Sequence, residues 1–156
     1  MNEVLRLHIN APPDSFSKLR ISNRQHAYIR NASRVAAKDG YREVCGIFFE
    51  RNGYLRFLRK QNRTAQSGRY VLARKHLREA VVRASGIHGA FHSHSISGAH
   101  PSGGDIKAGP RQGYAVIYDV IGDEFRLWRI VRYKKSLLQC FDFDRNWLLD
   151  TSDDVT

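Results

Sequence analysis

The sequence predicts an α/β domain in which a mixed or mostly antiparallel central sheet is flanked by helices. Three observations support this: several short segments alternate apolar and polar residues, two longer segments carry apolar residues at helical spacing, and an Asn-Gly pair joins two β-rich segments. A chain of 156 residues is most simply one domain, which we expect over residues 1–149. The acidic stretch 150–156 is expected to be a disordered tail.

The first part of the chain is expected to form a strand, a helix and a hairpin. Residues 4–9 alternate as a half-buried strand does. Ser22 is a suitable N-cap for a helix over 23–38, and Lys38-Asp39-Gly40 is a suitable stop. The segments 43–50 and 54–59 flank Arg-Asn-Gly, which predicts a hairpin turn.

The second part is expected to contain a helix between strands, followed by another hairpin. We predict a short strand at 70–72, a helix over 74–85 that Gly86 ends, and a strand over 87–94. Residues 114–119 and 124–133 predict a hairpin across Val-Ile-Gly-Asp. The segment that follows, through Trp147, mixes aromatic and charged residues and receives no assignment.

Composition narrows the class of protein and of partner. The formal net charge is +11, but the basic residues are scattered and match no nucleic-acid-binding motif, so we favour an acidic protein partner over nucleic acid. No apolar run is long enough to span a bilayer, and the N-terminal stretch lacks the apolar region of a secretory signal. The two cysteines, Cys45 and Cys140, are far apart and form no CxxC motif. We therefore expect a cytoplasmic protein without a disulfide framework.

The stretch 92-HSHSISGAHPSGGD-105 predicts a metal site. His92 and His94 are two residues apart, so on a strand their imidazoles point to the same face. Asp105 follows eleven residues after His94, where Ser102 can cap a helix. An isolated His-x-His pair is more often structural, and a first-turn aspartate can simply stabilise a helix dipole. Together, two imidazoles and one carboxylate make an open three-ligand site, the arrangement of catalytic zinc.

A zinc hydrolase also needs a group that takes up and returns a proton. Glu43 is the best candidate, at the start of a strand whose Cys45-Gly46 allows close backbone packing. A glutamate at a strand edge is by itself usually only solvated. Other zinc chemistries fit less well, because the chain has no HExxH helix and no CxxC of the kind that nucleobase deaminases carry.

The combined pattern resembles the JAMM (MPN-domain) zinc metallopeptidases. It consists of Glu43-Val44-Cys45-Gly46, then His92-Ser93-His94, then Pro101-Ser102-Gly103-Gly104-Asp105, and with the order of elements it spans roughly residues 20–133. The resemblance implies a single MPN domain with a cytidine-deaminase-like architecture. It also implies that His92, His94 and Asp105 bind Zn²⁺, that Glu43 is the general acid/base, and that Ser102 donates its hydroxyl to the oxyanion.

The same resemblance implies a peptidase or isopeptidase that cleaves after the C-terminal glycine of a ubiquitin-like protein. We expect a deconjugating or precursor-processing enzyme of a bacterial ubiquitin-like conjugation system for antiphage defence, with the conjugation enzymes as further partners. The alternatives are a peptidase of a sulfur-carrier or phage-tail assembly pathway, a DNA-associated member, and a non-catalytic MPN scaffold.

Four residues near the motif need separate interpretation. Ser95 and His100 depart from the commonest family pattern, but neither replaces a ligand. We interpret His100 as a solvated loop residue, with a contact to a ligand side chain or to substrate as the alternative. His88 shares the strand parity of the ligands, and we interpret it as structural. Cys45 is expected to pack near Glu43 rather than act as a nucleophile.

Overall fold

The structure is a computed structural model. It describes residues 5–9, 20–64, 66–96, 98–99, 102, 105, 114–130 and 137–142, and of 5–9, 129–130 and 137–142 the backbone alone is considered. The expected tail at 150–156 lies outside these residues. The described elements are β1 (Leu5–Ile9), α1 (Asn23–Lys38), β2 (Cys45–Arg51), β3 (Tyr54–Lys60), α2 (Arg74–Arg83), β4 (His88–His94), β5 (Tyr114–Asp119), β6 (Glu124–Ile130) and β7 (Leu137–Asp142).

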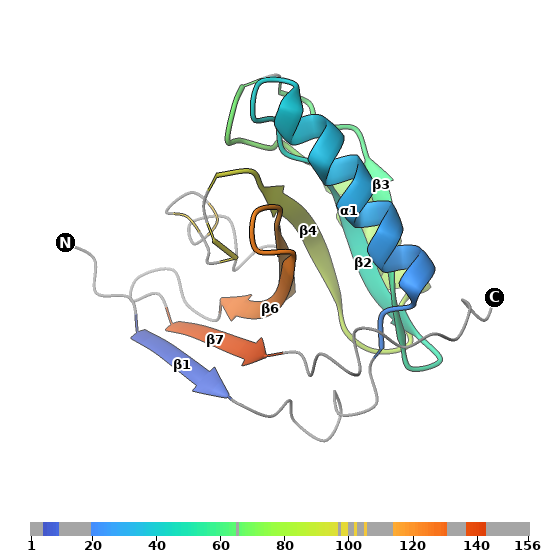
Figure 1. The fold of residues 1–156 in the computed structure, drawn as a ribbon. Helices are drawn as coiled ribbons and strands as arrows, with labels where there is room; N and C mark the ends of the chain where they lie inside the picture. The colour runs from blue at the N-terminus through green and yellow to red at the C-terminus, as the bar shows by residue number, and fades with distance from the viewer. Residues whose placement is uncertain are drawn as a thin grey trace.

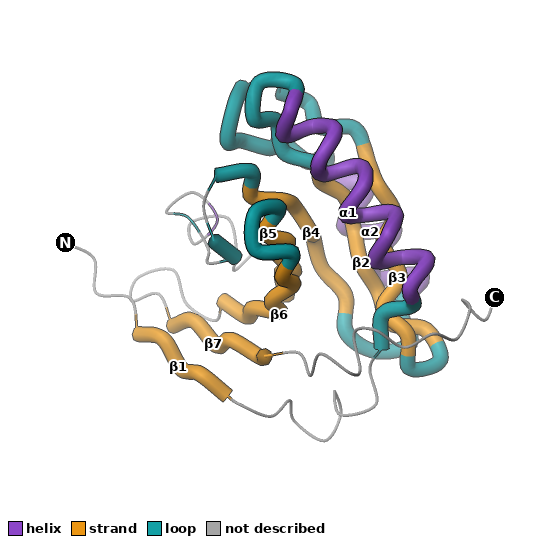
Figure 2. The backbone as a smooth tube through the Cα atoms, viewed as in Figure 1, coloured by secondary structure: helices purple, strands orange, loops and turns teal. Residues whose placement is uncertain are grey.

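The strands form one mixed sheet, which confirms the predicted α/β class (Figure 1). Its order over the described residues is β1-β7-β6-β5-β4-β2-β3. The pairs β1–β7 and β4–β5 are parallel, and the other neighbours are antiparallel. Strand β3 is the edge strand beside α1, and Figure 2 shows both helices at this end of the sheet.

The two helices pack on opposite faces of β2 and β3. Ile29 of α1 belongs to a buried cluster with Phe48 and Phe57, whereas Ala80 of α2 packs with Ile47 and Phe49. Because successive side chains of a strand point to opposite faces, Phe48 and its neighbours Ile47 and Phe49 must lie on different sides. Each helix therefore buries one face of the same strands.

Close packing between β2 and β4 depends on two glycines. Gly46 lies opposite Phe91, and Phe48 lies opposite Gly89, so each phenylalanine ring covers a glycine of the partner strand. A Cβ at Gly46 would lie 2.1 Å from the carbonyl oxygen of Leu58 and 2.6 Å from the Phe91 ring. The sequence-based expectation that Gly46 permits close backbone packing is confirmed.

Several predicted boundaries agree with the structure. The hydroxyl of Ser22 accepts a hydrogen bond from the Gln25 amide at 3.1 Å, as an N-cap does. Helix α1 ends at Lys38, and the next residues include Gly40 at φ 74°, in the left-handed region that favours glycine. Asn52 and Gly53 both have positive φ, as a two-residue hairpin turn requires.

Two predictions were wrong, each for a local reason. Residues 70–72 form no strand, because the Val71 amide donates to the Asn62 side chain and so joins no ladder. Helix α2 ends at Arg83 with Ala84 as an extended C-cap, so Gly86 does not end it. Gly86 instead permits close approach of Glu50, whose Oε1 would lie 1.8 Å from a Cβ there.

The previously unassigned segment after residue 133 contains β7, which pairs with both β1 and β6. In the described part of the chain, no helix is long and apolar enough to cross a membrane.

We expect Gly46→Ala to lower the free energy of unfolding by about 2 kcal/mol, since overpacking a filled core costs roughly 1–3 kcal/mol. The new methyl group would have to displace both the Phe91 ring and the β3 backbone. Thermal and denaturant unfolding would measure the loss. Val82→Ala, at a residue that is 84% exposed, is the control and should be nearly neutral. An unchanged midpoint for Gly46→Ala would contradict the packing described here.

Candidate metal centre

The pairing of β2 with β4 brings the two histidines to the face that α2 covers. His92 lies opposite Cys45, and Ala90 lies opposite Ile47, which belongs to the α2 cluster. Because residues directly opposite share a face, His92 and His94 point to the α2 side of the sheet. Both side chains are buried. The predicted same-face geometry of the pair is therefore present.

Three donor atoms converge at this point. His92 Nε2 lies 3.1 Å from His94 Nε2, and Asp105 Oδ2 lies 3.0 Å from His92 Nε2 and 3.2 Å from His94 Nε2. Each imidazole nitrogen carries at most one hydrogen, so hydrogen bonds cannot satisfy all three contacts at once. Ligands on a tetrahedral zinc are separated by a similar distance, roughly 3.3 Å for metal–nitrogen bonds of about 2.05 Å. His92, His94 and Asp105 could thus hold a metal ion.

A hydrogen bond to the main chain fixes His94 in the tautomer that a metal ligand needs. Its Nδ1 lies 2.8 Å from the carbonyl oxygen of Gly98. A carbonyl only accepts, so Nδ1 carries the hydrogen and Nε2 can offer its lone pair. Burial lowers the pKa of His94, but the bonds to Asp105 and Gly98 outweigh burial and raise it. In the metal-free protein a proton can therefore take the place of a metal ion.

The His92 imidazole is held by an aromatic ring rather than by a hydrogen bond at Nδ1. Its buried Nδ1 has no hydrogen-bond partner among the described residues. The Tyr70 ring instead stacks on the imidazole, with centroids 4.3 Å apart and planes inclined by 21°. Tyr70 lies just before α2, in the segment that was wrongly predicted as a strand. Sequence analysis missed this contact, since nothing in the spacing links residues 70 and 92.

Asp105 both contacts the histidines and closes a local loop. The Ser102 amide donates to Asp105 Oδ2 at 2.9 Å, and the Asp105 amide donates to Ser102 Oγ at 3.2 Å. This reciprocal pair is a capping box. Burial alone would raise the pKa of Asp105, but the hydrogen bonds from His92, His94 and the Ser102 amide hold it well below its usual range. Because Ser102 Oγ accepts in this pair, its own hydrogen stays available to donate.

Glu43 is positioned by Ser93, the residue between the two histidines. The Val44 amide donates to Ser93 Oγ at 2.9 Å, and the Ser93 amide donates to the Val44 carbonyl at 2.9 Å. These bonds fix the residue before β2 against the end of β4. Glu43 is only 8% exposed, and burial raises the pKa of its carboxyl, although the nearby imidazoles lower it. The structure therefore brings Glu43 next to the three converging donors.

Asn62 connects Glu43 to the segment that carries Tyr70. Its Nδ2 donates to the carbonyl oxygens of Glu43 and Arg69, each at 3.0 Å. Its Oδ1 accepts from the amides of Thr64, at 3.2 Å, and Val71, at 3.0 Å. The side-chain amide therefore uses two donors and two acceptor positions. A single asparagine after a strand gives no sequence signal of this role.

Cys45 packs beside Glu43 as expected, and His88 is outside the donor group. Cys45 is fully buried beside Glu43, and burial together with the Glu43 charge raises the pKa of its thiol to about 12. It is therefore a protonated thiol at neutral pH, not a nucleophile. His88 stands at the start of β4 and is not part of the three-residue donor group. His100 lies outside the described residues.

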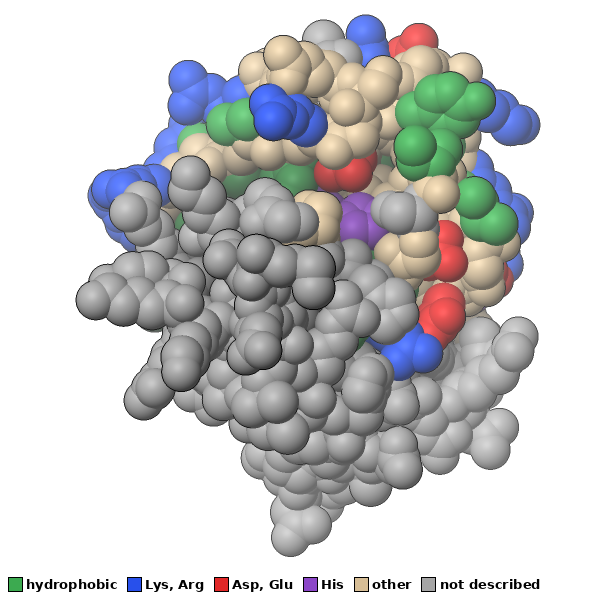
Figure 3. Space-filling model, turned by 90° about the vertical axis from the view of Figure 1, so that its left-hand side faces the viewer, with side chains coloured by type: hydrophobic (Ala, Val, Ile, Leu, Met, Phe, Trp, Pro, Cys, Tyr) green, Lys and Arg blue, Asp and Glu red, His purple; other side chains and the backbone are tan. Residues whose placement is uncertain are grey.

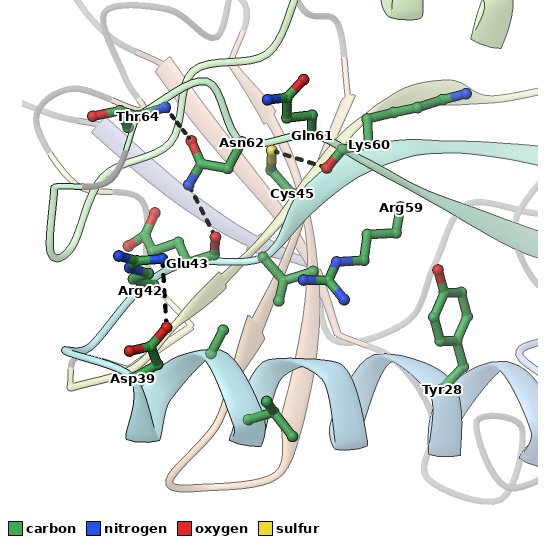
Figure 4. Close-up of a pocket in the computed structure, with 13 residues that line it drawn as sticks. Tyr28, Asp39, Arg42, Glu43, Cys45, Arg59, Lys60, Gln61, Asn62 and Thr64 are labelled. Atoms are coloured by element: carbon green, nitrogen blue, oxygen red, sulfur yellow. Dashed lines mark hydrogen bonds and ion pairs between the residues drawn. The ribbon is translucent and has the colours of Figure 1, made fainter.

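The described site residues are largely buried, with His92 1% and His94 3% exposed. Figure 3 shows a small area of histidine at the surface, with an acidic side chain beside it. Figure 4 shows Glu43 at one end of a neighbouring cavity, with Asn62 beside it.

Comparison with known proteins adds little to this geometry. No family model and no curated protein matches the chain. A solved structure described as "JAMM: A Metalloprotease-like Zinc Site in the Proteasome and Signalosome" is similar, with a TM-score of 0.44 and 17% identity. The similarity covers 75% of this chain and 89% of that chain. A similarity of this size identifies no family, so the interpretation below is based on the residues and their geometry.

We expect the purified protein to bind one Zn²⁺ per chain, and His94→Ala to weaken binding at least tenfold because it removes one of three donors. Elemental analysis and competition with a chelator would measure both. His88→Ala is the matched control, since this histidine is on the same strand but outside the donor group. Equal zinc affinity for the His94 and His88 variants would contradict the site.

Tyr70→Ala should weaken zinc binding about tenfold, as loss of a residue that orients a ligand does. Tyr70→Phe should keep the affinity, because the ring and not the hydroxyl stacks on His92. Tyr41→Ala, at an exposed tyrosine, controls for loss of an aromatic ring. If Tyr70→Phe weakened binding as much as Tyr70→Ala, a hydrogen bond rather than stacking would be responsible.

Proposed function

We propose that this chain is a JAMM-type zinc peptidase that cleaves an amide bond after the C-terminal glycine of a ubiquitin-like protein. The observation that carries the proposal is the convergence of His92, His94 and Asp105 beside the buried carboxyl of Glu43. The pattern of these residues in the sequence resembles that family, and the geometry is compatible with it. Zn²⁺ held there would supply Lewis acidity for carbonyl polarisation and water activation.

In this proposal Glu43 moves the proton. Its carboxylate takes a hydrogen from the attacking water and returns it to the amine that leaves. Glu43 is suited to this role because its main chain is held on two sides, by the Asn62 amide and by the Val44–Ser93 bonds. In the described part of the chain, no hydrogen bond to its carboxylate is recorded, so these oxygens can face water and amine.

Ser102 is proposed as the donor to the carbonyl oxygen that becomes negatively charged. Its hydroxyl oxygen already accepts a hydrogen bond from the Asp105 amide, and the residue is exposed. A donor that is oriented before the reaction stabilises the developing charge without reorganisation. The capping box therefore links one metal donor, Asp105, to the oxyanion donor.

The substrate class and setting rest on the resemblance and on charge. A slender tail that ends in glycine can approach a buried metal site as an extended strand. The net charge of +11 favours an acidic protein partner. We propose a cytoplasmic enzyme of a bacterial ubiquitin-like conjugation system, and a sulfur-carrier or phage-tail assembly pathway is the alternative.

A non-catalytic scaffold would need none of the arranged donors. All five proposed functional residues are present, and the four that surround the metal position are buried or partly buried together. Retention of a complete donor set with an adjacent carboxyl therefore favours an enzyme.

The test is mass spectrometry of a panel of ubiquitin-like proteins that carry C-terminal extensions, each incubated with the zinc-loaded protein. We expect cleavage after the terminal glycine of at least one. Glu43→Gln should lower the rate about 10²–10⁴-fold, since it removes the proton acceptor. Ser102→Ala should lower it about 10²–10³-fold.

Glu124→Gln, at an exposed carboxylate on β6, is the matched control and should retain the activity. If the zinc-loaded protein cleaves no panel member, the result would favour the scaffold interpretation. Cleavage that survives Glu43→Gln unchanged would contradict the proposed mechanism.

A further inference from the structure

We infer that the cavity between α1 and the β3 edge binds the substrate segment on the amine side of the cleaved bond, and that Arg59 selects an acidic side chain there. This inference rests on the proposed function, because it assigns a substrate position relative to Glu43. It concerns a surface outside the metal centre.

The cavity has a volume of about 560 Å³ and adjoins the proposed base. Its walls are α1 from Tyr28 to Ala36, the segment from Asp39 to Cys45 that leads into β2, and the end of β3 with the loop after it. Figure 4 shows Glu43 at one end and Tyr28 at the other, with the Arg59 side chain in the space between helix and strands. Val35, Ala36 and Val44 contribute apolar surface. The cavity can therefore hold the aliphatic part of a side chain as well as a charge.

Three cations line the cavity, and Arg59 is the one that forms no ion pair with a described residue. Arg42 pairs with Asp39 at 3.4 Å, and Lys60 pairs with Glu79 at 2.7 Å. Arg59 makes no ion pair with any described residue, although its positive charge offsets a small part of the rise in the pKa of the Cys45 thiol. An arginine so placed can bind a carboxylate through two parallel hydrogen bonds.

The edge of β3 offers main-chain groups beside the same arginine. Two outward amides of this edge already donate hydrogen bonds. The Leu55 amide donates to the Arg20 carbonyl at 2.8 Å, and the Phe57 amide donates to the Gln25 side-chain oxygen at 2.7 Å. By strand alternation the Arg59 amide also faces outward, and no described residue pairs with it. An extended peptide could therefore add to the edge at Arg59. The residue opposite Arg59 would point to the same face, where an acidic side chain would meet the guanidinium.

The role of Glu43 assigns the direction of the substrate. The group that protonates the leaving amine must contact that amine. The chain that begins at the amine then continues from Glu43, and the cavity that Glu43 lines is the adjoining space. The acidic residue is therefore expected within the first residues after the cleaved bond.

The first test varies the extension of a panel protein that the enzyme cleaves. Three extensions are compared, in which the first three positions after glycine are all Glu, all Gln or all Lys. The value of kcat/KM is measured for each extension. We expect the Glu extension to be cleaved about fivefold faster than the Gln extension, the effect of one exposed ion pair. Arg59→Glu should reverse the order of Glu and Lys. Arg51→Glu, at the far end of β2, changes the net charge equally and should keep the order.

The second test measures binding without a cleavable bond. Fluorescein-labelled peptides that begin with a free amine and Glu-Glu-Glu or Gln-Gln-Gln are titrated with the zinc-loaded protein, and anisotropy gives the affinity. We expect Arg59→Glu to abolish the preference for the acidic peptide and Arg51→Glu to retain it. Equal effects of the two variants would overturn the inference, because only net charge would then matter.

The two tests separate failure of the inference from failure of the proposed function. If all three extensions are cleaved at the same rate, the proposed peptidase activity stands and the inferred acidic subsite is wrong. If no panel protein is cleaved, the proposed function fails for that panel, and the binding titrations still decide whether Arg59 forms an acidic subsite.

Discussion

The antiparallel register of β2 and β4 is the constraint on which the site depends. Cys45 lies opposite His92, and the Val44–Ser93 bonds continue this contact past the end of the ladder. A shift by one residue would send both imidazoles to the other face of the sheet. The register is held by Phe91 over Gly46 and by Phe48 over Gly89, contacts that a larger residue at either glycine would exclude. Core packing on the α1 face thus determines the geometry of polar groups on the α2 face.

The polar groups around the metal position are arranged at an electrostatic cost. Burial disfavours the charged forms of Glu43 and Asp105, and the Asp105 charge further raises the pKa of Glu43. The two imidazoles and the Ser102 amide compensate Asp105, whereas Glu43 keeps a raised pKa. A dication at the centre would relieve the crowding of three donor atoms within 3.2 Å of one another.

Positioning of the proposed catalytic groups depends on residues outside the three-residue donor group. Asn62 ties the Glu43 carbonyl to the loop that delivers Tyr70, and Tyr70 stacks on His92. One side-chain amide therefore connects the proposed base to the ring that holds a metal donor. Preorganised groups of this kind reduce the reorganisation that a reaction requires. Glu43 and Asn62 also line the cavity beside α1, whereas Arg59 makes no hydrogen bond or ion pair with these residues in the described part of the chain. A change at Arg59 could therefore alter substrate preference without breaking this network.

The sequence by itself determined the fold class, most element boundaries and the five candidate site residues, because alternation, caps, an Asn-Gly turn and a His-x-His pair are local patterns. It also predicted that Gly46 permits close packing. Only the tertiary structure decided what depends on contacts between distant segments: that 70–72 is no strand because Asn62 takes the Val71 amide, that Gly86 approaches Glu50 rather than ending a helix, and that β7 joins β1 to β6. The contacts of Ser93, Asn62 and Tyr70 around the site likewise arise from strand pairing and loop closure. Such partners are far apart in the chain, so no spacing within one segment can show them.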